Sequence, residues 1–259
     1  MSAPVFICPA AADAVVGSVL EVSGDEGRHA VTVQRREVGE TVDLVDGAGA
    51  RARGIIVWAQ SGAMRVEVLE VSRDSGAPAI LVQALAKGGR DEQAVEAATE
   101  LGVTAVVPWA ADRSIVQWRG AKADKARERW VSLVTAAAKQ SRRASIPTVD
   151  TLATTKQLVA VVRAAVEDGA RVLVLHESAS TPLVDLDWAQ SEQTPVWMLV
   201  GPEGGISDHE IEELTGAGAM PVLLGPHVLR ASSAGPAALA ALSVLRGSWS
   251  SRHDAGALR

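Results

Sequence analysis

The sequence is poor in the residues that build disulfides, metal sites and membrane spans. It contains one cysteine, Cys8, which excludes a disulfide within the chain and a metal cluster built on cysteines. The five histidines are scattered and form no His-x-x-x-His pair, so no metal site is expected. No stretch reaches the roughly 18 uninterrupted apolar residues that a membrane span requires. Because the start of the chain also lacks a basic segment followed by a hydrophobic one, we expect a cytoplasmic protein that does not contact a membrane.

Aromatic residues other than tryptophan are almost absent. The chain has no tyrosine, one phenylalanine and seven tryptophans. Tryptophans are expected mainly in the core. Trp109 and Trp118, which are close in sequence to Arg113, are the two that could instead stack on nucleic-acid bases.

The net charge is -6, but the charges are unevenly distributed along the chain. Residues 113–143 contain nine basic and two acidic residues, a local charge of +7. Such a segment can be an ordinary solvated helix face. It can also form, together with Lys87 and Arg90, the basic patch that binding to a phosphate backbone requires.

The pattern of the 259 residues predicts two domains. Short alternating segments over 41–45, 54–58 and 64–71, separated by turns such as Ser61-Gly62, predict a small all-β domain. Beyond it, strand and helix patterns alternate, which predicts an α/β domain with a parallel sheet covered by helices. The predicted strands cover 80–85, 105–108, 171–175, 196–200 and 221–224, and the predicted helices cover 91–101, 121–140, 155–167, 208–214 and 236–246.

The most informative segment, 199–207 (LVGPEGGIS), joins an apolar strand to a helix through a glycine-rich loop. Ser207 and Glu210 have the spacing of a capping box at the start of that helix. Glycines at this place let a ligand approach the main chain, although a purely structural turn would also use glycine and proline. The spacing matches neither the dinucleotide-binding fingerprint nor the P-loop.

A second glycine-marked strand end, at Gly225-Pro226, follows within 30 residues of the first. Ligands of parallel sheets bind at the carboxyl ends of the strands. The loops after Leu175, Val200 and Leu224 are therefore the expected binding site.

Several blocks of the sequence match one known family in the same order. They are 84–90 (ALAKGGR), 98–103 (ATELGV), 112–114 (DRS), 138–143 (AKQSRR), 199–207 (LVGPEGGIS), 223–230 (LLGPHVLR) and the alanine-rich helix after them. On these blocks the chain resembles the RsmE family of 16S ribosomal RNA uridine-N3 methyltransferases, which belong to the SPOUT class. Weaker similarity to the family's N-terminal RNA-binding domain at 29–31 and 38–40 extends the resemblance to nearly the whole chain.

The resemblance implies the fold, the cofactor and the partners. It implies a SPOUT-type α/β methyltransferase domain over 79–247 with a C-terminal trefoil knot near 196–246. A PUA-like RNA-binding β-barrel domain over 1–72, a linker over 73–78 and a flexible tail over 248–259 complete the expected organisation. The implied cofactor is S-adenosylmethionine, the implied partner is 16S rRNA or the small ribosomal subunit, and the implied assembly is a homodimer.

The implied reaction is methylation of N3 of a uridine, expected at uridine 1498 of the 16S rRNA. Two alternatives stay open: another SPOUT reaction, on a ribose 2′-hydroxyl or on guanine N1, and a non-catalytic RNA-binding relative.

The resemblance also assigns the site residues. Arg230 is the expected catalytic residue. The residues expected to bind the cofactor are Leu175, His176, Glu177, Leu199, Val200, Gly201, Pro202, Glu203, Gly204, Gly205, Leu224, Gly225, Leu229, Ala231, Ser232, Ser233 and Ala234. The residues expected to bind RNA are Arg28, His29, Arg35, Lys87, Arg90, Arg113, Ser114, Gln140, Arg142 and Arg143.

Methylation of uracil N3 requires loss of the imide proton and stabilisation of the charge that spreads over N3 and its flanking carbonyl oxygens. The guanidinium of Arg230 suits the second task, because it can donate two parallel hydrogen bonds. Its alternative is structural, an ion pair with a carboxylate such as Glu203. Glu203 itself is expected to orient the loop or the ammonium group of the cofactor, and Glu177 either accepts hydrogen bonds from the cofactor or is a solvated turn residue.

The chain departs from the family at 229–233, where relatives commonly read Leu-Arg-Thr-Glu-Thr and this chain reads Leu-Arg-Ala-Ser-Ser. The missing carboxylate leaves the general base unassigned, because hydroxyl groups are poor bases near neutral pH. We expect one of Ser232 and Ser233 to cap the last helix, with Pro236 in its first turn, and the other to contact the cofactor. Arg142 stands where the family has glycine, which adds charge and alters the local backbone.

Overall fold

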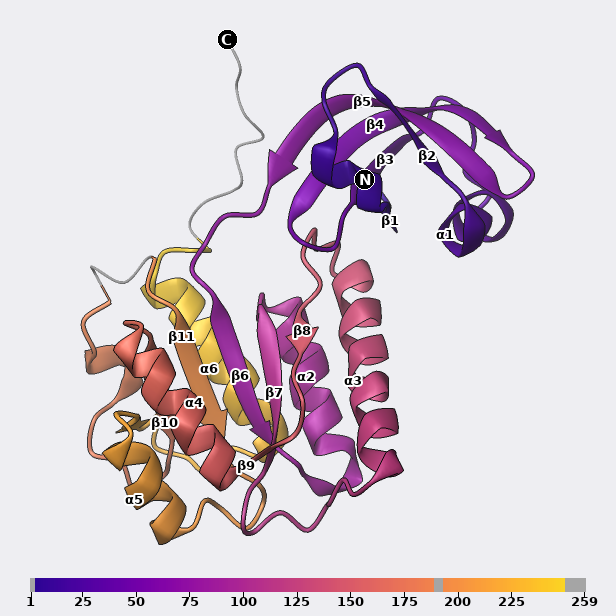
Figure 1. Cartoon of the computed structure of the whole chain (residues 1–259). Coiled ribbons are helices and arrows are strands. Elements are labelled where there is room, and N and C mark those ends of the chain that lie inside the picture. The colour runs from indigo at the N-terminus through magenta and orange to yellow at the C-terminus, as the bar shows by residue number, and fades with distance from the viewer. Residues whose placement is uncertain (1–2, 189–192, 250–259) are drawn as a thin grey trace. The chain divides into compact units, whose positions relative to one another are not determined.

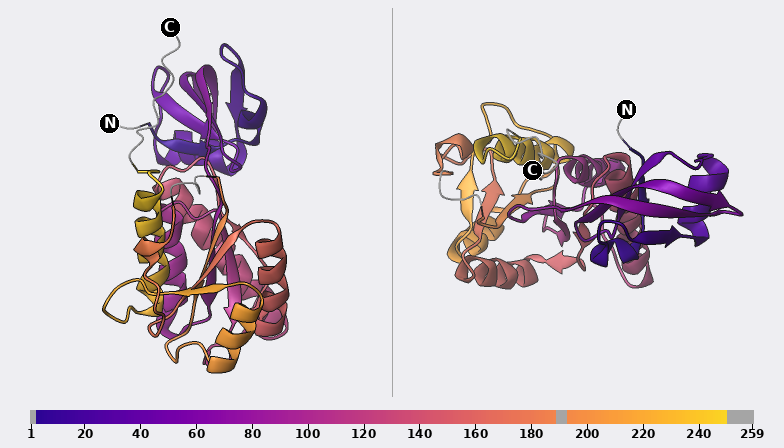
Figure 2. Two further views of the ribbon diagram at one scale, coloured as in Figure 1. Left: turned by 90° about the vertical axis from the view of Figure 1, so that its left-hand side faces the viewer. Right: turned by 90° about the horizontal axis from the view of Figure 1, so that it is seen from above.

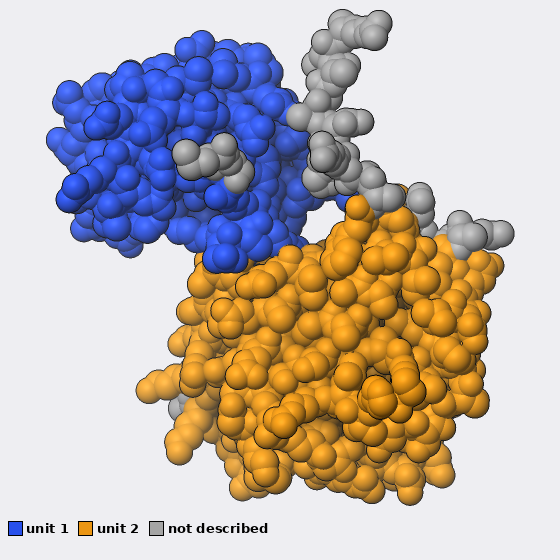
Figure 3. All heavy atoms as spheres, turned by 180° about the vertical axis from the view of Figure 1, so that it is seen from behind, with its two compact units in different colours: residues 1–75, 138–146 blue, residues 76–137, 147–259 orange. Residues whose placement is uncertain are grey.

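The computed structural model describes residues 3–188 and 193–249. Within them the chain divides into two compact units (Figure 3). The first comprises residues up to 75 together with 138–146, and the second comprises 76–137 together with the chain from 147 onward. Residues 138–146, which the sequence analysis places in the second domain, thus group with the first unit. From position 250 on, the tail expected over 248–259 lies outside the described residues.

The first unit is built on a five-stranded sheet with the order β1-β3-β4-β5-β2. The strands are β1 Val5–Ile7, β2 Val19–Val22, β3 Thr41–Val45, β4 Ala50–Gln60 and β5 Ala63–Arg73, and the short helical turns are η1 Pro9–Asp13, α1 Gly24–Arg28 and η2 His29–Val33. Buried residues alternate with partly buried or exposed ones along most of β4 and β5, and this alternation places Ile56 and Val66 in the core with Phe6. The predicted turn at Ser61-Gly62 is confirmed. Both residues have positive φ (51° and 75°), as a tight turn between antiparallel strands requires.

The second unit contains a sheet with the order β12-β10-β11-β6-β7-β8, in which every pair is parallel (Figure 1). The short strand β9 also pairs with β7. The strands are β6 Ala79–Ala84, β7 Ala105–Ala110, β8 Thr148–Val149, β9 Ala153–Thr154, β10 Arg171–Leu175, β11 Val196–Val200 and β12 Met220–Val222. The parallel sheet predicted from the alternating pattern is therefore confirmed.

Helices cover both faces of this sheet (Figures 1 and 2). They are η3 Lys87–Gly89, α2 Arg90–Glu100, α3 Ala121–Gln140, α4 Thr155–Glu167, η4 Leu183–Asp185, α5 Asp208–Gly216 and α6 Ala231–Leu245. On one face, Val82 of β6 packs in a cluster with Leu158 of α4 and Leu214 of α5. On the other face, α2 and α6 pack against each other and against β6. Because both faces are covered, all six residues of β6 are buried.

The last helix differs from its prediction. α6 begins at Ala231, not at residue 236, and Pro236 lies inside it. The Gly235-Pro236 pair suggests a helix start, but both residues lie inside α6, and Gly235 is a packing contact. A Cβ atom at Gly235 would lie 2.8 Å from Cδ1 of Leu81, so the glycine allows α6 to approach β6 closely.

None of the helices in the described part of the chain combines the length and the hydrophobicity needed to cross a membrane. Among the same residues, no group of three or more His, Cys, Asp and Glu side chains is placed to hold a metal ion.

Candidate active site

Three loops of the second unit leave the sheet at neighbouring carboxyl ends. β10 lies between β12 and β11, and the register places Leu175 opposite Val200 on one side and Val222 on the other. The loops that start at residues 176, 201 and 223 therefore begin at the same level of the sheet. This edge is the candidate site, because parallel sheets bind ligands there.

Main-chain hydrogen bonds hold two of these loops side by side. The N–H of His176 donates to the carbonyl of Val222 (3.1 Å), and the N–H of Leu223 donates to the carbonyl of Thr181 (2.9 Å). The segments that the sequence analysis assigns to the cofactor after β10 and after β12 are thus brought together.

The glycine-rich loop 201–207 is folded tightly. A Cβ atom at Gly201 would lie 2.5 Å from Cγ1 of Ile206, and one at Gly204 would lie 3.0 Å from the Cβ of Arg113. Gly205 has a φ of +74°, which side chains other than glycine rarely adopt. The turn itself therefore requires these glycines, so their presence alone does not identify a ligand.

Glu203 ties this loop to the loop after β6. Its Oε1 accepts hydrogen bonds from the main-chain N–H of Lys87 (3.1 Å) and from Nη1 of Arg90 (2.8 Å). Burial by itself raises the pKa of Glu203, but the hydrogen bonds and the charge of Arg90 outweigh it and hold the pKa below its ordinary value. The alternative in which Glu203 pairs with Arg230 is therefore wrong, and a carboxylate with a lowered pKa is a weak base.

Glu210 is a structural centre that the sequence analysis missed. The predicted capping box with Ser207 is confirmed, but Glu210 is also fully buried, and its Oε1 accepts hydrogen bonds from two other segments. The donors are the N–H of Asp112 (2.9 Å) and the hydroxyl of Thr155 (2.7 Å). One carboxylate thus joins the loop after β7, the start of α4 and the start of α5. These partners are 98 and 55 residues away, and no local spacing indicates them.

Three predicted RNA-binding residues of the second unit, Lys87, Arg90 and Arg113, contact the glycine-rich loop 201–207. Nη1 of Arg113 donates to the carbonyl of Gly204 (3.2 Å), while Lys87 and Arg90 hold Glu203. Ser114 is largely buried, and its Oγ has no hydrogen-bond partner among the described residues. Three cationic residues therefore lie around the glycine-rich loop at the sheet edge.

The remaining RNA-binding candidates belong to the first unit; they are Arg28, His29, Arg35, Gln140, Arg142 and Arg143. Arg28 forms an ion pair with Asp25, and the ring of His29 hydrogen-bonds the side chain of Gln34 at 2.9 Å. Arg142 has a φ of +59°, a conformation that costs a residue other than glycine about 1 kcal/mol. Arg142 thus has a left-handed backbone conformation that glycine adopts without this cost.

Arg230 stands at the junction of the loop after β12 and α6. It is the N-cap of α6, and its carbonyl accepts the N–H groups of Ser233 (2.8 Å) and Ala234 (3.0 Å), while its side chain is exposed. The helix therefore begins before Ser232 and Ser233, and the expectation that one of these serines caps it is wrong. The N–H groups that precede Ser233 in the first turn lack carbonyl partners within the helix, which favours an anionic ligand group at this end.

The loop after β12 leaves space beside it. A Cβ atom at Gly225 would meet no other atom, and Val228 and Leu229 are 75% and 40% exposed. In contrast, Leu199 and Val200 are buried in β11, so they can reach a ligand only at the strand end. Exposed aliphatic side chains beside main-chain donors suit a ligand with an apolar ring and a charged end.

The two tryptophans considered for base stacking differ in exposure. Trp109 is fully buried and donates its Nε1 hydrogen to Thr155 (3.1 Å), so it is a core residue. Trp118 is partly exposed and packs edge to face against Trp130, with 5.1 Å between the ring centroids. Only Trp118 keeps the possibility of stacking on RNA.

Comparison with known proteins agrees with this arrangement. Residues 73–243 match the model of the RNA methyltransferase domain family. The chain is 46% identical over 235 residues to ribosomal RNA small subunit methyltransferase E of Mycobacterium bovis, covering 90% of this chain and 89% of that protein. Its identity to the Bacillus subtilis protein of the same name is 29%, covering 86% and 88% of the two chains. Methyltransferase E of Neisseria gonorrhoeae, solved with bound S-adenosyl methionine, superposes with a TM-score of 0.80 at 26% identity and covers 94% of this chain and 98% of its own.

Proposed function

The chain belongs to the ribosomal RNA small subunit methyltransferase E family, and from this premise we propose that it methylates N3 of a uridine in 16S rRNA with S-adenosylmethionine. The expected nucleotide is uridine 1498. The observation that supports this proposal best is the meeting of the loops after Leu175, Val200 and Val222 at one sheet edge, next to Arg230.

The residues at this edge fit the cofactor. Main-chain groups at 200–205, the open space at Gly225 and the exposed Leu229 suit an adenosine group, and the first turn of α6 suits a carboxylate. The adjoining His176 and Glu177 offer polar contacts for ribose hydroxyls. When bound, S-adenosylmethionine supplies an electrophilic methyl group on a sulfonium centre.

Arg230 has the role of stabilising the uracil anion. Its exposed guanidinium can donate hydrogen bonds to a uracil carbonyl oxygen that gains charge when the N3 proton leaves. Glu203 does not suit the role of base, because its carboxylate is occupied by Lys87 and Arg90 and its pKa is lowered. The acceptor of the N3 proton is therefore left unassigned among these groups.

We extend the proposal to the assembly and the topology. The first unit, with the boundary expected near residue 72, acts as a PUA-like RNA-binding domain, and the chain near 196–246 forms a trefoil knot. A second copy of the chain completes the site. The support for this dimer is the family to which the chain belongs, because knotted enzymes of this class usually complete the substrate site with the partner subunit.

Methyl transfer to small ribosomal subunits tests the reaction. The subunits are purified from cells that lack this protein and incubated with labelled S-adenosylmethionine, and the modified nucleoside is identified. Formation of 3-methyluridine supports the proposal. A 2′-O-methylated nucleoside or 1-methylguanosine would replace it with another SPOUT reaction, and cofactor binding without transfer would favour a non-catalytic relative.

The Arg230→Ala variant tests the catalytic residue. We expect kcat to fall by about 100- to 1,000-fold, because a donor to the developing anion is lost, while the affinity for S-adenosylmethionine is kept. Arg163→Ala, at an exposed position on α4, is the matched control and keeps its turnover. Wild-type turnover in Arg230→Ala would refute the role.

A further inference from the structure

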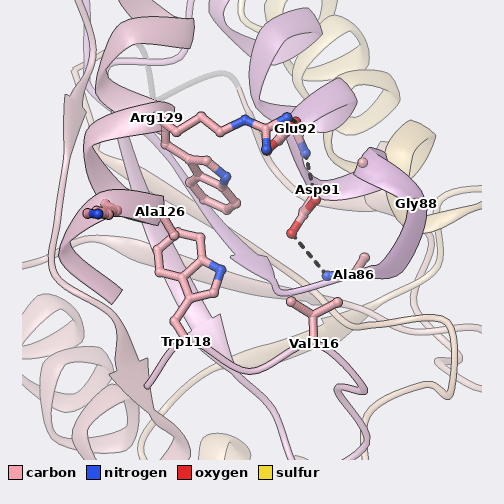
Figure 4. Close-up of a pocket in the computed structure, with 11 residues that line it drawn as sticks. Ala86, Gly88, Asp91, Glu92, Val116, Trp118, Ala126 and Arg129 are labelled. Carbon is pink, nitrogen blue, oxygen red and sulfur yellow. Dashed lines mark hydrogen bonds and ion pairs between the residues drawn. The ribbon is translucent and has the colours of Figure 1, made fainter. Parts of the chain in front are cut away.

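A cavity separate from the three loops described above opens beside the start of α2 in the second unit. Its volume is about 440 Å³, which lies in the range of small-ligand sites. Gly88 and Asp91 line one side, and Trp118 lies across from them, with Arg129 of α3 above (Figure 4). The cavity therefore combines an aromatic wall with charged groups.

The aromatic wall is held in place by the core. Trp130 is 1% exposed, and its ring meets that of Trp118 at 82° with 5.1 Å between centroids. Trp118 remains partly exposed and lines the cavity. A rigidly held indole at the edge of a cavity is a suitable platform for stacking a flat ring.

The opposite side presents carboxylates. Asp91 is 5% exposed, and its oxygens accept the N–H groups of Ala86 (3.2 Å) and Glu92 (2.9 Å). Each carboxylate oxygen has a second lone pair, so Asp91 can accept a further hydrogen bond. Glu92 also lines the cavity, and its Oε2 accepts from Nη2 of Arg129 at 2.8 Å. These acceptors match the exocyclic amino groups of adenine, cytosine and guanine, which uracil lacks.

Cationic side chains flank the same cavity. Lys125 and Arg129 are one helical turn apart on α3, so they lie on the same side of that helix, and both line the cavity. Both are exposed, as groups that hold a phosphate at the mouth of a site must be.

The cavity is linked to the candidate active site through one loop. Gly88 and Gly89 line the cavity, and the neighbouring Lys87 and Arg90 hold Glu203 of the glycine-rich loop. The residues that line the cavity at 88–89 are thus adjacent in sequence to two residues that contact the glycine-rich loop of the candidate active site.

We infer that the cavity binds an unpaired nucleotide of the substrate RNA, outside the nucleotide that is methylated. Its base stacks on Trp118 and donates an amino hydrogen to Asp91 or Glu92, and its phosphate contacts Lys125. The preferred bases are therefore those with an exocyclic amino group. This inference rests on the proposed function, since it takes RNA as the substrate.

Binding of short RNA tests the inference apart from catalysis. Fluorescently labelled hexaribonucleotides of adenosine, cytidine or uridine are titrated with the full chain, and the affinity is read from anisotropy. We expect the adenosine and cytidine oligomers to bind more tightly than the uridine oligomer. Trp118→Ala is expected to weaken the tighter binding about 10-fold or more, and Trp118→Phe to keep most of it, because phenylalanine retains a ring for stacking.

Two charge reversals on α3, one inside and one outside the cavity, test the contribution of Lys125. Lys125→Glu is expected to weaken binding several-fold more than Lys122→Glu, which changes an exposed lysine outside the cavity on the same helix. Equal losses in both would show a general basic surface and overturn the inference. Unchanged affinity in Trp118→Ala, or equal binding of the three oligomers, would also overturn it. If Trp118→Ala fails to fold, as its melting curve would show, Trp118→Phe and the lysine pair still decide.

Turnover separates this inference from the proposed function. With small ribosomal subunits as substrate, Trp118→Ala is expected to raise KM for the subunit while the affinity for S-adenosylmethionine is kept. If the wild-type chain forms 3-methyluridine but the oligomer pattern fails, only the cavity inference falls. If the oligomer pattern holds and no 3-methyluridine forms, the proposed function falls and the nucleotide site remains.

Discussion

Replacement of Glu210 by alanine is expected to destabilise the second unit by about 4 kcal/mol. The variant leaves two donors that reach Glu210 from other segments, the N–H of Asp112 and the hydroxyl of Thr155, without their acceptor. Each unsatisfied buried donor costs about 1–3 kcal/mol, and loss of the capping interaction with Ser207 adds about 1 kcal/mol.

Glu210→Gln separates the network from simple loss of volume. The glutamine amide keeps one oxygen, which can accept from Asp112 and Thr155, but its NH2 group replaces the oxygen that accepts from the N–H of Ser207. We therefore expect the free energy of unfolding to fall by about 1–2 kcal/mol. The exposed Glu212 on the same helix provides the control, and Glu212→Ala should change stability by less than about 0.5 kcal/mol.

Urea unfolding at neutral pH, followed by tryptophan fluorescence, measures the three variants. Trp109 is a suitable reporter, because its indole nitrogen donates to Thr155 within the same network. If Glu210→Ala were as stable as Glu212→Ala, the hydrogen bonds to Glu210 would not stabilise the second unit as the structure indicates.

Three further predictions concern the glycine-rich loop and the core of the first unit. Gly201→Ala brings a Cβ to 2.5 Å from Cγ1 of Ile206, so it should lower the free energy of unfolding in urea by about 1–3 kcal/mol and weaken S-adenosylmethionine binding. The control is Gly216→Ala, whose Cβ would meet nothing within 4 Å and which should change stability little. Equal effects of the two variants would contradict a steric clash at Gly201. The lowered pKa of Glu203 means that its ionised form stabilises the folded chain at neutral pH, and that this stability is lost as the pH falls from the carboxyl's ordinary value through its lower folded value. Glu203→Gln should therefore lose less stability than the wild type between about pH 7 and pH 3, and parallel losses would be inconsistent with the ion pair. Burial raises the pKa of Cys8, so a thiol reagent at about pH 8 should label it slowly in the folded chain and rapidly after unfolding, and rapid labelling of the folded chain would contradict its burial.

The strands and helices whose bounds are set by residues close in sequence were predictable. The strands over 171–175 and 196–200 and the helices over 121–140 and 155–167 have the predicted bounds. Their signals act over a few residues: side-chain periodicity, and caps such as the box that Thr154 forms with Gln157.

The start of α6 was not predictable in this way. Gly235 and Pro236 have the local chemistry of a helix boundary, but the position of α6 is set by packing against Leu81 of β6 and by the carbonyl of Arg230. Likewise, nothing in the sequence around Arg142 indicates its conformation, and the structure shows that its backbone is left-handed, with a φ of +59°.

Some features of the candidate site were also predictable from the sequence, and others were not. The sequence by itself indicated which loops form the candidate site, because glycine-marked ends of apolar strands and the motifs around Gly201 and Gly225 are contiguous in the chain. Only the tertiary structure decided that Glu203 pairs with Arg90, that Glu210 joins three segments and that Trp118 borders a cavity. The physical reason is distance along the chain. Contacts between residues 55 to 116 positions apart depend on the order of the strands in the sheet, which short-range periodicity does not encode.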